Sequence, residues 1–247
     1  QASERASARA ACSDCLSASS ARCCIASSRS AHGGSVASGF GAAGAATATG
    51  AAALVGDGEA AVTRGVLHMY NNTGQSCNAP SRMLVPRDRL AEAEQIAAAV
   101  SQSIVVGDTA SQDTNMGPVV SKVQWDKIQG LIQQGIDEGA KLVCGGTGLP
   151  DGVETGHYVR PTVFSEANND MVISREEIFG PVFAMMIVES DEEAIKLAND
   201  TSYGLQASLF TSSVTKAHKY GRALQAGTVS VNCYGEGDIS TPFGGYK

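Results

Sequence analysis

The sequence has no apolar run of the roughly 20 residues that a helix needs to cross a bilayer, which argues against a helical membrane protein. Charged residues are scarce, at 17% of 247, and acids exceed bases to give a net charge of −7. This balance argues against a strongly basic nucleic-acid binder. No repeat at a solenoid period is present. The chain is long enough to bury a core without a disulfide or a metal staple.

Large apolar residues are nearly missing from the first 53 positions, where alanine and serine make up more than half of the sequence. Four of the seven cysteines also lie there: Cys12, Cys15, Cys23 and Cys24. Such a segment cannot bury enough apolar surface to offset the entropy lost on ordering. We therefore expect residues 1–55 to be disordered or poorly packed.

Three interpretations of residues 1–55 remain open. A Ser- and Arg-rich composition with few acids is typical of a transit peptide. The Cys12-x-x-Cys15 pair suggests zinc, but no second pair follows at finger spacing, so we predict no metal. The third interpretation, which we favour, is a GC-rich coding sequence translated out of frame, since such triplets yield Ala, Gly, Arg, Ser and Cys.

From about Gly56, ordinary helical and strand patterns alternate. The apolar spacing predicts helices at 60–70, 88–104, a segment capped by Ser121, 190–199 (opened by a Ser190–Glu193 capping box) and 214–224. Strands are predicted at 82–85, 141–144, 158–164, 182–188, 207–210 and 228–231. Strands that alternate with helices favour an α/β fold with a mostly parallel sheet flanked by helices.

Cys77 lies in a polar, Gly-containing segment directly after a predicted helix. A substrate can reach a thiol in such a place, and nearby N–H groups can stabilise a thiolate or an oxyanion. Composition alone favours a buried structural cysteine here. Cys144 and Cys233 lie at strand ends, and for them we keep the structural interpretation.

An acid, an aromatic ring and a Gly-Pro turn fall together at residues 176–181. The acid can accept hydrogen bonds from sugar hydroxyls, and the ring can pack on a flat heterocycle. A solvated acidic turn with Phe179 in the core is the simpler interpretation of this segment alone. The terminal Pro242–Lys247 is, by itself, only a turn. The four histidines show no ligand or triad pattern, and we expect structural or surface roles.

Taken together, these segments resemble the catalytic half of the NAD(P)-dependent aldehyde dehydrogenase superfamily. The match runs from about Gly56 to Lys247. It rests on Gly74-Gln75-Ser76-Cys77, Met116-Gly117-Pro118-Val119, Gly156–Phe164, Glu177-Ile178-Phe179-Gly180-Pro181, Asn199 with Tyr203-Gly204-Leu205, Val231-Asn232 and Pro242–Lys247.

The resemblance implies a mechanism and a set of site residues. Cys77 would attack the aldehyde, pass through a thiohemiacetal and, after hydride transfer to the cofactor, form a thioester that water hydrolyses to the carboxylic acid. Glu177 would hold the nicotinamide ribose and Phe179 would pack near the nicotinamide. Phe243 and the loop 234–240 would border the aldehyde pocket. NAD is favoured over NADP.

The sequence departs from the family pattern in three places. The family's general base would fall at Ala43, and we expect that the cofactor domain that precedes this region is absent and that residues 56–247 are a catalytic domain truncated at its C-terminus. The chain as written would lack the deacylation base and the side-chain oxyanion donor. A non-catalytic fragment or structural partner of an intact homologue is therefore the alternative, and transfer of the thioester to coenzyme A is a third option.

The resemblance also implies where the protein acts and with what. We expect a small-molecule aldehyde as the partner, neither nucleic acid nor a membrane, and a homo-oligomer in the intact protein. We also expect a cytoplasmic location, because Cys77 must stay reduced to act.

Overall fold

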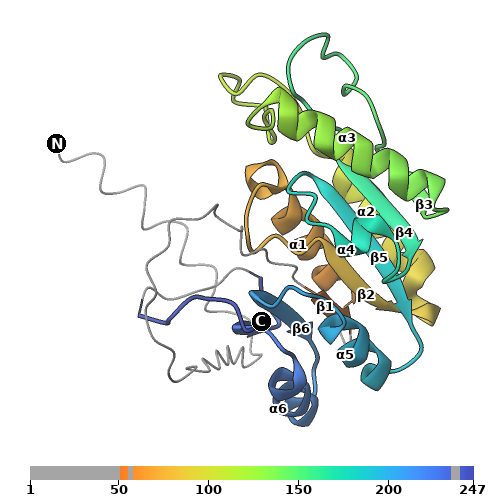
Figure 1. Ribbon diagram of the computed structural model, residues 1–247, viewed down its shortest axis with the longest axis vertical. Helices are drawn as coiled ribbons and strands as arrows, with labels where there is room; N and C mark the ends of the chain where they lie inside the picture. The colour runs from red at the N-terminus through yellow and green to blue at the C-terminus, as the bar shows by residue number, and fades with distance from the viewer. Residues whose placement is uncertain (1–50, 55–57, 235–239) are drawn as a thin grey trace.

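The computed structural model describes residues 51–54, 58–234 and 240–247, and within them it contains one seven-stranded sheet (Figure 1). The strands are β1 (Ala51–Leu54), β2 (Arg82–Pro86), β3 (Lys141–Cys144), β4 (Thr162–Ala167), β5 (Val182–Val188), β6 (Gln206–Phe210) and β7 (Thr228–Val231). Their order is β3-β4-β5-β2-β1-β6-β7, and every pair is parallel except the edge pair β3–β4. The predicted α/β fold with a mostly parallel sheet is confirmed.

The helices fall close to where the apolar spacing places them. They are α1 (Gly58–Tyr70), α2 (Leu90–Gln102), α3 (Lys122–Asp137), α4 (Val172–Arg175), α5 (Asp191–Asn199) and α6 (Val214–Ala223), with short 3₁₀ turns η2 (Asn71–Gly74) and η3 (Arg87–Arg89). The hydroxyl of Ser121 accepts a hydrogen bond from the backbone N–H of Gln124 at 3.2 Å and so caps α3 as expected.

The helix α5 begins with a variation on the predicted capping box. The Ser190 hydroxyl accepts from the backbone N–H of Glu193 at 3.1 Å. The Glu193 carboxylate, however, accepts from the backbone N–H of Glu189, one residue before the cap, at 2.6 Å. The side chain still satisfies an amide at the helix start, which is the physical purpose of the motif.

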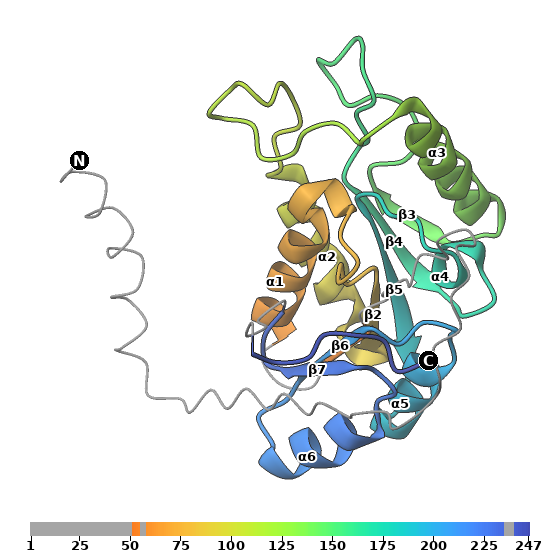
Figure 2. The ribbon, with the colours of Figure 1, turned by 60° about the vertical axis from the view of Figure 1, so that its left-hand side comes forward.

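Helices cover both faces of the sheet (Figures 1 and 2). On β2, Leu84 belongs to one buried cluster while Met83 and Val85 belong to the other. The first cluster packs under α3, α5 and α6, and the second under α1 and α2. Successive strand residues face opposite sides, so both sides of these central strands are apolar, as expected for a covered parallel sheet.

The strand β1 lies in a segment that the sequence analysis assigned to disorder. Residues 51–54 pair in parallel with β2 on one side and β6 on the other, near the centre of the sheet. The prediction was wrong for these four residues, because two neighbouring strands supply backbone hydrogen bonds that a local composition argument does not consider. Residues 1–50, which include Ala43, lie outside the described residues.

The strand predicted at 158–164 begins only at Thr162. The carbonyl of Tyr158 accepts from the Trp125 indole N–H at 2.8 Å, and the carbonyl of Arg160 accepts from the Thr162 hydroxyl at 2.7 Å. Pro161 has no N–H to donate to a ladder. These side-chain contacts replace strand pairing there. Within the described residues, no helix has the length and apolar character of a membrane crossing.

Candidate active site

The topology of the sheet explains why two motifs one hundred residues apart in the sequence lie together. Cys77 precedes β2 by five residues, and Glu177 precedes β5 by five residues. The strands β2 and β5 are direct parallel neighbours, with Arg82 opposite Ala184. The amino ends of neighbouring parallel strands lie at the same edge of a sheet, so both motifs meet at that edge.

Gly74 brings the two motifs into direct contact. Its φ is +69°, and a Cβ at this position would lie 2.3 Å from the carbonyl oxygen of Gly180. Asn72 and Thr73 also have left-handed backbones, with φ of 51° and 58°. Residues other than glycine rarely adopt the left-handed region of φ and ψ, so three residues in a row with this backbone define the conformation of the turn before Cys77. Only glycine allows the close approach of these two backbones.

Hydrogen bonds also fix the loop that carries Cys77. The Gln75 side-chain oxygen accepts from the backbone N–H of Val120 at 2.9 Å. The Thr73 hydroxyl donates to the carbonyl of Gly117 at 3.3 Å. Inside the loop, the Asn72 amide donates to the Gln75 carbonyl at 2.9 Å. The Cys77 loop is thus held against the segment 116–119 of the resemblance and the residue that follows it, Val120.

Among the cysteines in the described part of the chain, Cys77 is exposed, Cys144 is half-buried and Cys233 is buried. Burial raises the pKa of the Cys144 thiol. Cys77 therefore combines access with a rigid loop, whereas the environments of Cys144 and Cys233 fit the structural roles expected of them. Within the described residues, no group of His, Cys, Asp and Glu is placed to hold a metal ion.

The turn that carries Glu177 and Phe179 is held by side chains from two other elements. Phe179 has a φ of +54°, and the Gln124 amide donates to the carbonyls of Ile178 at 2.9 Å and Phe179 at 2.8 Å. The backbone N–H of Glu177 donates to the Tyr203 hydroxyl at 3.1 Å.

The Glu177 carboxylate is the group at this turn that is placed to meet a ligand. Within the described residues, the hydrogen bonds of Glu177 run through its backbone, including its carbonyl, which accepts from the Lys127 amine at 2.6 Å. Burial raises the pKa of the Glu177 carboxyl, and the Lys127 charge partly opposes this. The carboxylate is therefore half-buried and available to accept hydrogen bonds from hydroxyl groups.

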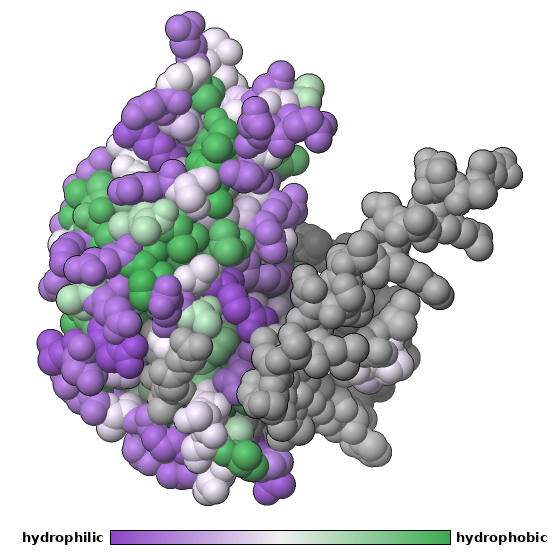
Figure 3. Space-filling model, turned by 180° about the vertical axis from the view of Figure 1, so that it is seen from behind, coloured by the Kyte–Doolittle hydropathy of each residue, from purple (hydrophilic) through white to green (hydrophobic). Residues whose placement is uncertain are grey.

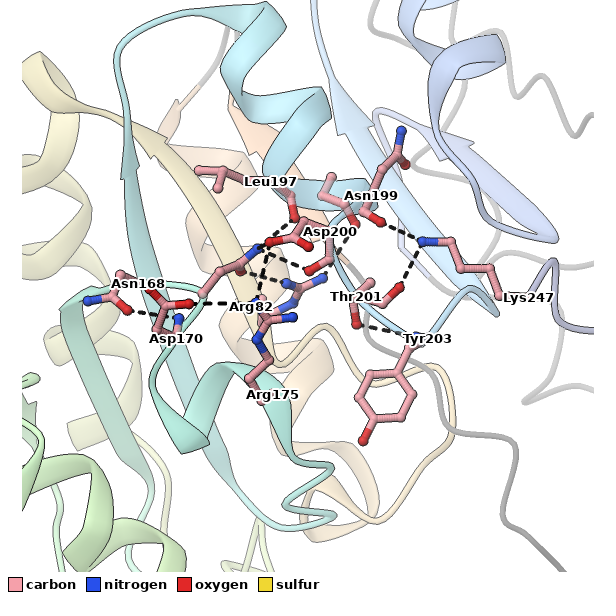
Figure 4. A network of polar contacts seen from close by, with 12 residues as sticks. Arg82, Asn168, Asp170, Arg175, Leu197, Asn199, Asp200, Thr201, Tyr203 and Lys247 are labelled. Atoms are coloured by element: carbon pink, nitrogen blue, oxygen red, sulfur yellow. Dashed lines mark hydrogen bonds and ion pairs between the residues drawn. The ribbon is translucent and has the colours of Figure 1, made fainter.

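A polar network built on two buried side chains, Arg82 and Asn169, supports the same edge of the sheet (Figure 4). The Arg82 guanidinium, only 1% exposed, donates to the Asn169 side-chain oxygen at 3.1 Å, and the Asn169 amide donates to the Asp200 carboxylate at 3.0 Å. Arg175 approaches Asp200 at 3.4 Å. Burial, with the Arg175 charge nearby, lowers the pKa of Arg82 to about 10. The network therefore anchors the start of β2, where the Cys77 loop ends, to the turn that leads to Tyr203.

Phe243 lies on the C-terminal segment, and its side chain is not held in the way that the residues of the two loops are. Its side chain is 60% exposed. The segment is joined to the fold by the backbone N–H of Tyr246, which donates to the Gly204 carbonyl at 2.8 Å. Residues 235–239 of the expected pocket loop lie outside the described residues. The proposed role of Phe243 in an aldehyde pocket therefore stays a prediction.

Other residues of the resemblance have structural roles here. The Asn199 amide donates to the Ala223 carbonyl at 2.9 Å. The Asn232 side chain pairs with both backbone groups of Thr211, at 2.8 and 2.9 Å. His68 stacks on Tyr234, with ring centroids 5.9 Å apart, in line with a structural role. These contacts explain why the motifs extend beyond the site itself.

The sequence analysis did not mention Gln124 and Lys127, and it quoted Gln75 and Tyr203 only as part of the resemblance, without a role in holding the two loops. Gln124 and Lys127 lie three residues apart on α3 and so share one helix face, which is the only local signal of a joint role. Their partners are backbone groups far away in sequence. No residue pattern marks such partners before the topology is known.

Several large apolar side chains are exposed, among them Val120 and Val123 at 82% and 79%. Figure 3 shows apolar side chains gathered in patches among hydrophilic ones on the face turned away from the viewer in Figure 1. Exposed apolar patches commonly mark surfaces that another domain or subunit covers. A homo-oligomeric intact protein stays a prediction.

Curated proteins similar to this chain are described as dehydrogenases of aldehydes. The chain is 50% identical over 191 residues to a 3-succinoylsemialdehyde-pyridine dehydrogenase from Pseudomonas sp, covering 77% of this chain and 40% of the relative. It is 42% identical to the mitochondrial aldehyde dehydrogenase of Equus caballus, covering 76% and 37%. The chain thus spans about 40% of the length of the curated relatives that it matches.

Solved structures show the same fold. An aldehyde dehydrogenase C mutant from Pseudomonas syringae, complexed with NAD+ and octanal, matches with a TM-score of 0.78 and 44% identity over 81% of this chain and 41% of that one. A Mycobacterium tuberculosis aldehyde dehydrogenase complexed with NAD+ matches with a TM-score of 0.78 and 38% identity, covering 81% and 42%. The model of the aldehyde dehydrogenase family matches residues 52–247, and the chain belongs to that family.

Proposed function

We propose that this chain is the catalytic part of an NAD(P)-dependent aldehyde dehydrogenase, which oxidises an aldehyde to a carboxylic acid, with NAD favoured. The observation that carries the proposal is the contact between the Cys77 loop and the Glu177–Phe179 turn through Gly74 and Gly180. This contact supports the proposal because the first loop carries an exposed thiol and the turn carries a half-buried carboxylate and an aromatic ring. The relatives described as complexed with NAD+, one of them also with octanal, support the same activity.

The exposed Cys77 is the nucleophile of the proposed mechanism. Its thiolate sulfur forms a bond to the aldehyde carbon, and the carbonyl oxygen becomes the oxyanion of a thiohemiacetal. The backbone N–H of Cys77 is a donor for that oxyanion. When bound, the nicotinamide cofactor accepts the hydride that leaves the former aldehyde carbon. The thioester that remains on Cys77 is then hydrolysed by water, which releases the acid and regenerates the thiol.

The turn at 177–181 orients the cofactor in this proposal. The Glu177 carboxylate would accept hydrogen bonds from the ribose hydroxyls of the cofactor, and the Phe179 ring would pack near its nicotinamide. Because three side chains fix the backbone of this turn, both groups are held in place before binding. Such preorganisation lowers the cost of ordering the site around a ligand.

The experiment that tests the proposal is NADH formation by the purified chain with an aldehyde and NAD+, followed by absorbance. Cys77→Ser is expected to lower the rate on the order of a thousandfold or more, because the hydroxyl is a far weaker nucleophile. Cys144→Ser is the matched control and keeps most of the rate. Full activity in Cys77→Ser would falsify the mechanism.

A non-catalytic role is the second candidate. Residue 43, where the family resemblance puts the general base, is an alanine. If the chain forms no NADH with either water or coenzyme A as acceptor, while an intact relative in the same assay does, the non-catalytic interpretation replaces the first. NADH formation that requires coenzyme A would instead indicate transfer of the thioester to that thiol.

A further inference from the structure

The N-terminal end of α3 touches both loops of the proposed active site. The backbone N–H of Val120, two residues before the helix, donates to Gln75 in the Cys77 loop. One turn later, Gln124 donates to the turn that carries Phe179. We propose that this end of α3 is a shared support that couples the nucleophile loop to the cofactor turn, with Gln124 as its positioning residue. The inference rests on the proposed function, which assigns chemistry to the two loops.

Gln124 is suited to hold a turn that is costly to form. Phe179 has a left-handed backbone, which a residue with a Cβ adopts only when its surroundings impose it. The single amide nitrogen of Gln124 binds both carbonyls of that turn, at 2.9 and 2.8 Å. Ser121 caps the helix at the same turn, which fixes the position of the Gln124 backbone.

Three residues on one face of the helix contact the same turn. Gln124, Lys127 and Ile128 follow the spacing that aligns side chains along a helix. Lys127 binds the Glu177 carbonyl, and a Cβ at Gly180 would lie 2.4 Å from the Ile128 side chain. The helix therefore contacts residues 177–180 through three hydrogen bonds and one apolar contact.

The contacts form a closed ring. α3 holds Gly180, Gly180 packs against Gly74, and Gln75 binds back to Val120 at the start of α3. Because the ring is closed, a change at Gln124 is transmitted to Cys77 even though the two side chains belong to different elements. Loss of the hydrogen bonds of either Gln124 or Gln75 opens the ring. The effects of the two substitutions on Cys77 should therefore not multiply in the double variant.

The test is the rate at which iodoacetamide alkylates Cys77 in the full chain, measured from the mass of its proteolytic peptide. The peptide with the buried Cys233 is the internal reference, and circular dichroism checks that each variant is folded. Gln124→Met keeps the length of the side chain and removes the donor. Gln124→Asn is a second variant whose shorter amide cannot span both carbonyls. Gln134→Met, at an exposed position of the same helix, is the matched control.

Gln124→Met and Gln75→Leu each remove two side-chain hydrogen bonds, and each is expected to slow alkylation of Cys77 about fivefold through the loss of loop order. The double variant should be only slightly slower than either single one. Gln124→Lys, which restores an N–H donor, should recover most of the rate. The proposal is overturned if Gln124→Met and Gln124→Asn match Gln134→Met, if the two effects multiply, or if Gln124→Lys remains slow.

This experiment separates the inference from the proposed function, because alkylation requires no turnover. If the chain forms NADH through Cys77 but the effects of the Gln124 and Gln75 substitutions on alkylation multiply, the inference is overturned and the proposed function is not. NADH formation that survives Cys77→Ser would overturn the proposed function. In an active chain, Gln124→Met should raise the KM for the cofactor more than it lowers kcat, and Gln75→Leu should do the reverse.

Discussion

The loop that carries Cys77 and the C-terminal segment that carries Phe243 are attached to the fold in different ways. The first is held by a glycine in tight contact, by left-handed residues and by hydrogen bonds from distant elements. The second is tied by the Gly244 carbonyl, which packs closely against Gly227, by the backbone N–H of Tyr246 and by Lys247, whose amine donates to the Asn199 and Thr201 carbonyls (Figure 4). Phe243 itself is largely exposed.

The difference between the two segments indicates where precision is needed. A nucleophile must be held to within a fraction of an ångström of the attacked carbon, and this favours a loop whose every backbone turn is specified. A residue that borders an apolar pocket can adapt to what enters it. The fold therefore constrains the loop around Cys77 by steric and polar contacts, whereas around Phe243 it fixes the backbone and leaves the side chain largely exposed.

Gly74→Ala should produce the largest change in stability. The added Cβ meets the Gly180 carbonyl and must also adopt φ of +69°, so we expect a loss of about 3 kcal/mol in the free energy of unfolding. Gly139→Ala is the control, since Gly139 has φ of +89° but open space around it, and about 1 kcal/mol is expected. Urea unfolding followed by circular dichroism measures both. Equal losses would show that the Gly74–Gly180 contact does not constrain the loop.

A smaller effect is expected from Glu177→Gln, and it should depend on pH. Burial raises the pKa of Glu177 in the folded chain, so between the usual carboxyl pKa near 4.5 and the raised value the folded state binds more protons than the unfolded state. The free energy of unfolding therefore decreases as the pH rises through this range. Replacement by glutamine should remove that part of the decrease. The free energy of unfolding of both proteins is measured at each pH. A difference between the two that does not change with pH would contradict the burial of this carboxylate.

The smallest change in stability is expected from Phe243→Ala. An exposed side chain with few contacts should alter the free energy of unfolding by less than about 0.5 kcal/mol. If Phe243 borders the aldehyde pocket, the KM for an apolar aldehyde should rise in the same variant. A loss of stability comparable to that of Gly74→Ala would remove the contrast between the two segments.

Much of the fold was accessible from local patterns, because apolar spacing and caps act over a few residues. The helix capped by Ser121 and the strand at 182–188 are examples. The strand at 51–54 was not accessible, because its pairing depends on β2 and β6, which follow far later in the chain. Similarly, the sequence motifs predicted Cys77 and Glu177 as site residues, but that the two motifs lie at one edge of the sheet follows only from the pairing of β2 with β5. The role of Gln124 depends on that tertiary contact and leaves no local signature.

The most direct test of the account is to expose the chain to 4-nitrophenyl acetate and locate the transferred acetyl group by peptide mass analysis. An activated ester acylates a nucleophilic thiol without any cofactor, so the experiment examines Cys77 alone. The account predicts an acetyl thioester on Cys77, with Cys144 and Cys233 unmodified, and a marked loss of this product in Gly74→Ala. An acetyl group on other cysteines while Cys77 remains free would contradict the assignment of Cys77 as the nucleophile.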